Sequence, residues 1–132
     1  MRDEIASYLG SQKMANFAVA KELPWSADGQ ALYLKNFKKI YVDRDTITQT
    51  DDLLTLGGPA AVRETTSVSV YFTTDAKNLP QDYDTLLGTV RSARLIPTIS
   101  GVIERQADVT TSYEGDAMIT QVEFRFSKLI LN

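Results

Sequence analysis

The chain has 132 residues, with 14 basic and 17 acidic side chains, and it contains neither histidine nor cysteine. This composition excludes disulfides, thiolate metal ligands and histidine-based acid–base chemistry, and the net charge of −3 argues against general binding of nucleic acid or anionic membranes. With 43% hydrophobic residues, this length predicts one domain over residues 1–132.

The first third of the chain predicts one helix and two strands. Apolar residues recur at helical spacing within residues 2–13, where the acidic side chains come first. This segment lacks the apolar stretch of a secretory signal, and no run in the chain approaches the roughly 20 apolar residues of a membrane span. Residues 17–23 predict a strand, PWSADGQ a loop, and residues 31–42 a second strand with a kink or bulge.

Residues 43–61, DRDTITQTDDLLTLGGPAA, predict a long irregular connection. Four aspartates and one arginine give this segment a net charge of −3, equal to that of the whole chain. Leu53, Leu54 and Leu56 lie beside a Gly-Gly-Pro turn. Because 19 residues are many for a connection in a compact domain, we expect either a mobile arm or a segment that contains a short element.

Residues 62–74 have the clearest strand pattern, with Val68, Val70 and Phe72 on one face. A turn follows, and Pro80 suits the first position of a helix. The apolar stripe of that helix would consist of Tyr83, Leu86, Leu87, Val90 and Leu95.

The last third predicts a hairpin, with strands over residues 102–113 and 117–131 and a turn at Glu-Gly-Asp. The predicted order is helix, two strands, long loop, strand, helix, two strands. It indicates an α+β fold, in which a single mixed or antiparallel sheet of about five strands carries two packed helices.

The chemistry-bearing residues give weak signals for catalysis. Asp43-Arg44-Asp45 could supply half of a magnesium site, but such a site normally needs more converging oxygen ligands, and a solvated start of the loop is the favoured explanation of the motif. Basic and aromatic residues interleave at residues 35–41, yet three lysines followed by an acidic loop make a poor footprint for nucleic acid.

A protein-binding surface is a stronger hypothesis. Tyr71 and Tyr113 fall on the more polar faces of their strands, and Leu53, Leu54 and Leu56 add apolar surface in the long loop. Either the loop folds back and buries its leucines, or these residues form an interface with another protein. The sequence leaves both readings open.

Three stretches carry a family resemblance. YLKNFKKIYVDRD, VSVYFTTDAKNLPQDYDTLLGTVRSAR and ITQVEFRFSKL resemble the tail terminator proteins of long-tailed, siphovirus-type bacteriophages. The resemblance runs from about residue 17 to the end and extends to length and element order. It is an overall pattern without a catalytic signature.

The resemblance implies a small α/β sandwich that acts as a structural protein and not as an enzyme, with no cofactor. Family members form a six-membered ring on the last ring of the tail tube, stop tube polymerisation and present a surface to the head connector. The implied partners are therefore other copies of the chain, the tail tube protein and the connector or neck protein. Genome DNA would pass through the lumen without specific binding.

The implied location is the top of the tail at the head–tail junction of the virion, after assembly in the host cytoplasm. The interface candidates that fit this role are the three loop leucines, Asp43, Arg44, Asp45, Tyr71 and Tyr113. Two alternatives remain. One is a head–tail connector or neck completion protein, and the other is a small Mg-dependent enzyme built on Asp43, Asp45 and Asp51 or Asp52.

Overall fold

A computed structural model describes residues 1–12, 14, 17–52, 61–96 and 101–131. The fold is α+β, with one mixed sheet of six strands and two α-helices, which confirms the predicted class. The elements are, in chain order, α1 (Arg2–Ser11), β1 (Ala18–Ala20), η1 (Leu32–Leu34), β2 (Lys39–Val42), β3 (Thr46–Asp52), β4 (Ala61–Asp75), α2 (Tyr83–Arg91), η2 (Ser92–Leu95), β5 (Val102–Glu114) and β6 (Ala117–Leu131).

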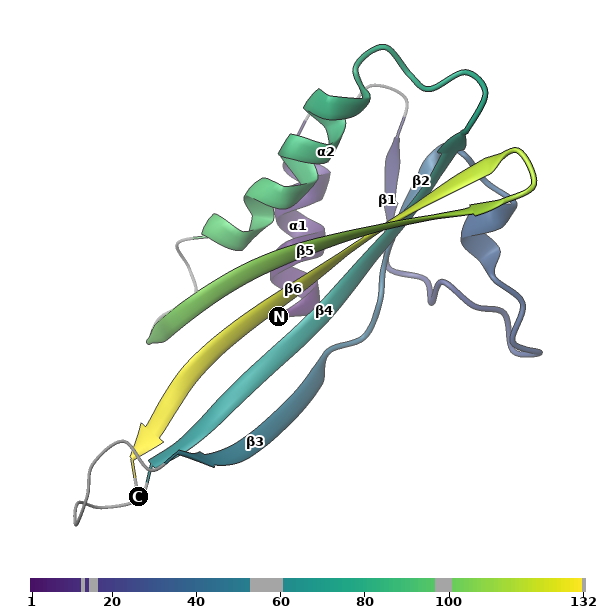
Figure 1. The fold of residues 1–132 in the computed structure, drawn as a ribbon. Helices are drawn as coiled ribbons and strands as arrows, with labels where there is room; N and C mark the ends of the chain where they lie inside the picture. Colours follow the sequence, from purple (N-terminus) through teal and green to yellow (C-terminus); the bar gives the residue numbers. More distant parts are fainter. Residues whose placement is uncertain (13, 15–16, 53–60, 97–100, 132) are drawn as a thin grey trace.

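The sheet is built around β4 and β6, which pair antiparallel along their whole length of 15 residues each. The strand order is β1-β2-β4-β6-β5, and β3 also pairs with β4. The strands are antiparallel neighbours except for the parallel pair β1 and β2. Both helices lie on the same face of the sheet (Figure 1).

The core lies between this face and the helices. Alternate residues of β4 and β6 point toward the helices, including Val70, Phe72, Val122 and Phe124, all of them fully buried. The apolar side of each helix that faces the sheet completes the core, with Ile5 and Leu9 from α1 and Leu86 and Val90 from α2. The period-2 pattern that predicted the burial of Val68, Val70 and Phe72 is confirmed.

Residues 46–52 of the predicted long connection form β3, which confirms that this segment contains an element, although residues 43–61 as a whole are not an irregular loop. The sequence did not mark this element as a strand, because TITQTDD holds a single large apolar residue, Ile47, and the side chains of residues 46–51 are exposed. Val42 pairs with Val70 and Thr46 with Ser67, so residues 43–45 of one strand face only residues 68 and 69 of the other. β2 and β3 are therefore one long strand interrupted by a β-bulge.

Several predicted boundaries also differ. Residues 31–38 hold the 3₁₀ turn η1 and not a strand, and β1 covers only three residues. The helix α2 begins at Tyr83 with Asp82 at its N-cap, so Pro80 precedes the helix instead of occupying its first position. Leu95 is 63% exposed because it lies in η2, beyond the helical stripe. The hairpin turn is formed by Gly115 and Asp116 alone, and Gly115 adopts a positive φ of 59°.

The sheet extends well beyond the helices at one end. We call this extension the arm: β3, the first half of β4 (residues 61–67) and the last part of β6 (residues 125–131) (Figure 1). The side of the arm that continues the helix-bearing face has no helix of the described chain above it, and Ile47 is 61% exposed there.

Candidate interaction surface

The face of the sheet opposite the helices, here called the helix-free face, is polar. Every second residue of these strands points to this side, and many of these residues are Ser or Thr. Two hydrogen bonds link these side chains across strands: Thr65 Oγ1 lies 3.0 Å from Ser127 Oγ, and the amide of Gln121 donates from Nε2 to Ser69 Oγ at 3.2 Å. The hydroxyl residues of this face in β3 to β6 include Thr46, Thr48, Thr50, Thr65, Ser67, Ser69, Thr110, Ser112 and Ser127.

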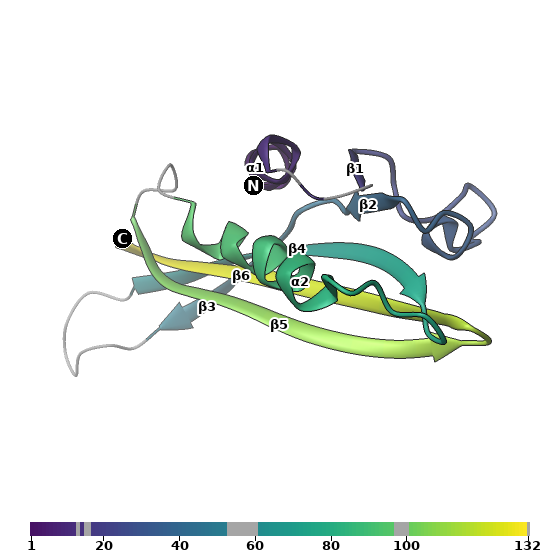
Figure 2. The ribbon, with the colours of Figure 1, turned by 90° about the horizontal axis from the view of Figure 1, so that it is seen from above.

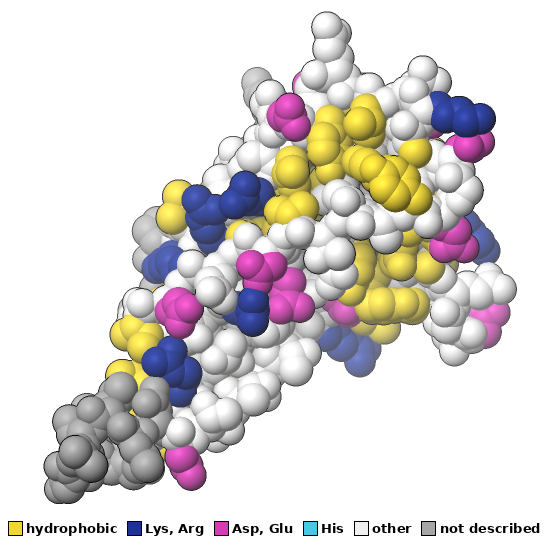
Figure 3. All heavy atoms as spheres, viewed as in Figure 1, with side chains coloured by type: hydrophobic (Ala, Val, Ile, Leu, Met, Phe, Trp, Pro, Cys, Tyr) yellow, Lys and Arg dark blue, Asp and Glu magenta, His cyan; other side chains and the backbone are white. Residues whose placement is uncertain are grey.

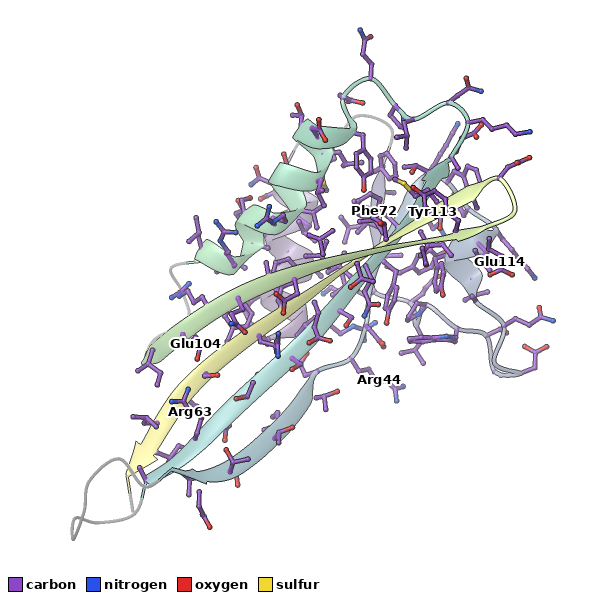
Figure 4. The ribbon with its side chains drawn as sticks, viewed as in Figure 1. Arg44, Arg63, Phe72, Glu104, Tyr113 and Glu114 are labelled. Atoms are coloured by element: carbon purple, nitrogen blue, oxygen red, sulfur yellow. The ribbon has the colours of Figure 1, made fainter. Side chains whose placement is uncertain are left out.

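The cationic side chains of the helix-free face are paired with acidic ones. Arg63 Nη1 lies 3.2 Å from Glu104 Oε2, and Figure 4 shows Arg63 on β4 near Glu104 on β5. Arg125 contacts Asp108 and lies 3.4 Å from Glu123 Oε1. Exposed ion pairs of this kind contribute little to the stability of a fold. Their main effect is that carboxylates neutralise the positive charge of the two guanidinium groups.

An aromatic cluster covers the other end of the helix-free face. Tyr33 of η1 stacks on Tyr71 of β4 with ring centroids 5.2 Å apart, and Trp25 meets Tyr71 edge to face at 5.4 Å. An isolated bridge between Trp25 and Ala31 closes a loop, with Trp25 at its base and Tyr33 just after it in η1. Burial raises the pKa of Tyr71 above its usual value. Tyr71, predicted as an interface residue, is thus partly covered by its own chain.

The bulge places Asp43, Arg44 and Asp45 in three different roles. Asp45 accepts a hydrogen bond from the backbone N–H of Arg2 at 2.7 Å and another from the Met1 amine at 2.8 Å, so it caps the start of α1. Asp43 Oδ1 accepts from the backbone N–H of Arg44 at 2.7 Å. The side chain of Arg44 is exposed. In the part of the chain that the structure describes, no group of three or more acidic residues is placed to hold a metal ion.

Tyr113 lies near the end of β5 and is 68% exposed, on the side of the helices with Val109 and not on the more polar face that the sequence predicted. Figure 3 shows hydrophobic side chains gathered over α2 and the adjacent end of β5. Val109 of the same strand is 37% exposed, and Leu79, in the loop before α2, is 47% exposed. The exposure of Leu79 and Ile47 was not anticipated, because single apolar residues in polar segments give no signal of their own in sequence.

A cleft of about 270 Å³ opens where the β4–α2 loop meets the segments around Phe17 and Phe37. Its walls carry charges of both signs, from Lys38, Asp75 and Asp82. The carboxylate of Asp75 already accepts a hydrogen bond within the chain, from the backbone N–H of Lys77 to Oδ1 at 2.9 Å. The lining residues are Phe17, Phe37, Lys38, Thr74, Asp75, Asn78, Pro80 and Asp82.

The interface residues proposed from the sequence do not converge on one site. Arg44 and Tyr113 lie on well-separated parts of the sheet (Figure 4), and Tyr71 lies in the aromatic cluster. Leu53, Leu54 and Leu56 lie outside the described residues. The geometry as a whole presents extended surfaces and strand edges, which suit contacts with other proteins better than the enclosure of a small substrate.

No protein-family model matches the chain, and no curated protein matches it. Of the helices described, none is both long and apolar enough to cross a membrane.

Proposed function

We propose that this chain is a tail terminator of a long-tailed bacteriophage. In this proposal it caps the tail tube as a hexameric ring, ends tube polymerisation and provides the surface to which the head connector attaches. The proposed partners are copies of the chain itself, the tail tube protein and the connector.

The observation that carries the proposal is the position of the three stretches that resemble the family. The first contains β2 and the bulge, the second contains the end of β4 and α2, and the third lies in β6. In the fold these elements are neighbours: Ile40 pairs with Phe72, β4 pairs with β6, and Leu86 and Val90 of α2 pack into the same core. The resemblance therefore follows one contiguous structural unit.

The electrostatics of the helix-free face are compatible with a channel for DNA. Several unpaired Lys or Arg side chains would bind phosphates and retard the passage of a genome. On this face Arg63 and Arg125 each have acidic partners within 4 Å, and the net charge of the chain is −3. A surface of hydroxyl groups and neutralised cations supports the proposed passage without specific binding.

The proposal is tested by tube growth. Purified protein would be added to polymerising tail tube protein encoded by a neighbouring reading frame, and tube lengths and ends would be measured by electron microscopy. We expect tubes to stop growing, with a six-fold ring at one end. Unchanged tube lengths and bare ends would refute the proposal, and binding to the isolated connector but not to tubes would favour the neck-protein alternative.

A further inference from the structure

The two free edges of the sheet stand out among the surfaces of the described chain. β5 forms one edge along 13 residues, and Figure 2 shows it at the margin of the sheet with no described element beyond it. On the opposite side β3 forms the edge along the arm, over 7 residues. Each edge presents unpaired N–H and C=O groups, which are a template for pairing with another strand.

Both edges contain a stretch without the charges that normally protect such strands. Residues 46–50 of β3 read TITQT and residues 109–113 of β5 read VTTSY. Neither stretch contains a charged residue or a proline, and both are rich in residues that favour β-structure. All ten side chains are exposed, so the described chain does not cover either stretch.

The strand directions make the two edges complementary. β4 and β5 are both antiparallel to β6 and are therefore parallel to each other, while β3 is antiparallel to β4. β3 consequently runs opposite to β5. If two copies sit side by side with their helices on the same side, β3 of one copy meets β5 of the next as an antiparallel pair.

The side chains match on both faces when the second copy is shifted along the strand direction, because within one sheet Thr48 is level with Glu104 and not with Thr110. On the side of the helices, Ile47 of β3 would meet the apolar or aromatic side chains of Val109 and Tyr113. On the helix-free face, Thr46 and Thr48 would meet Thr110 and Ser112, and cross-strand hydroxyl pairs of this kind stabilise sheets.

We propose that the free edge of β3 pairs antiparallel with the free edge of β5 of a second copy of the chain. The contact is head to tail, because it uses two different surfaces, and it joins the sheets of neighbouring copies into one continuous sheet. Repetition of a head-to-tail contact closes a ring when its rotation divides a full turn. The inference identifies the subunit contact of the ring that the proposed function requires, but it can be tested without any other phage component.

Cysteine cross-linking provides the test, because the chain has no cysteine of its own. A Thr48→Cys variant would be mixed with a Thr110→Cys or a Ser112→Cys variant that carries a different tag, under mild oxidation. All three positions lie on the helix-free face, so one of the two mixtures should give a cross-linked heterodimer. The matched control is Thr111→Cys, which lies between the other two β5 positions and points to the side of the helices.

We expect several-fold more heterodimer in one of the first two mixtures than in the Thr111→Cys control. Equal yields in all mixtures would overturn the proposal. Predominant homodimers of Thr110→Cys alone would also overturn it, because they would indicate a symmetric contact between two β5 strands.

A second measurement removes the dependence on disulfide geometry. Thr111→Lys places a charge on the free edge of β5 and should abolish self-association in analytical ultracentrifugation, with the melting temperature of the monomer unchanged. Thr85→Lys, an exposed position on α2, should leave association intact. Equal association of both variants would refute the edge contact. If β3 and β5 of neighbouring copies pair but the protein does not cap tail tubes, only the proposed function is refuted. If the protein caps tubes but the two edges do not pair, only the β3–β5 contact is refuted.

Discussion

Replacement of Asp45 by alanine should destabilise the fold measurably, although the residue is in an exposed-looking, acidic segment of the sequence. Its carboxylate accepts the backbone N–H of Arg2 at 2.7 Å and the Met1 amine at 2.8 Å, which anchors α1 to the bulge. By analogy with an N-cap side chain, loss of this acceptor for a backbone N–H at the start of a helix costs about 1 kcal/mol. The ion pair adds at most about 1 kcal/mol, because the Asp45 side chain is still 27% exposed.

The free energy of unfolding should therefore fall by about 1–2 kcal/mol in Asp45→Ala. For a chain of this size that corresponds to a decrease in melting temperature of roughly 3–8 °C, measured by circular dichroism. Asp43→Ala is the matched control, because the carboxylate of Asp43 accepts a hydrogen bond from the backbone N–H of the next residue, Arg44, and its loss should change stability by less than about 0.5 kcal/mol.

Asp45→Asn separates capping from charge, since asparagine keeps an acceptor oxygen and caps helices about as well as aspartate. It should lose less stability than Asp45→Ala, so the double variant Asp43→Asn/Asp45→Asn should stay folded and show no loss of tail assembly. Equal melting temperatures for Asp45→Ala and Asp43→Ala would refute the capping role. A metal-dependent turnover that disappears in the double asparagine variant would instead support the enzyme alternative.

Three further outcomes are expected. Trp25→Ala should lower the free energy of unfolding by about 1–2 kcal/mol in chemical denaturation, because one edge-to-face contact and its buried area are lost. The hydrogen bond from Gln49 lowers the pKa of Glu64, so the stabilisation from this contact is present above the unfolded-state pKa and is lost as the pH falls through the folded value. Gln49→Ala should raise the pKa of Glu64 in an NMR titration. Leu53→Ser/Leu54→Ser should impair assembly more than monomer melting, and a melting temperature lowered as for a core lesion would contradict this prediction.

The parts of the fold that could be predicted from sequence are those where burial imposes a period. Val68, Val70 and Phe72 alternate because one face of β4 meets the core, and Leu86 and Val90 repeat at helical spacing because one stripe of α2 meets the same core. β3 has no such constraint. The side chains of residues 46–51 are exposed on both faces, so tertiary pairing with β4 determines the structure of this strand and no periodicity marks it.

The roles of single residues were harder to infer, because they depend on contacts between distant segments. Asp45 caps a helix that begins 43 residues earlier in the chain, and Tyr71 is covered by rings from a loop whose sequence only indicates turns. Composition and spacing identify these residues as unusual but cannot specify their partners. The free edges of β3 and β5 are a property of strand order, which local patterns do not determine.

The arm is the region in which assembly should contribute most to stability. A sheet that is covered by a second layer gains free energy from burial, whereas a bare ribbon of strands is marginal in water. In the arm, the side that continues the helix-bearing face carries Glu64, which contacts both Gln49 and Lys128, next to the exposed Ile47. Since these contacts bury little apolar area, the stability of β3 depends mainly on its pairing with β4.

A neighbouring β5 would give β3 a second paired edge and would cover Ile47. Hydrogen exchange at the amides of β3 should therefore slow on self-association far more than exchange in the helix-covered centre of β4, and equal slowing in both strands would show that association acts elsewhere.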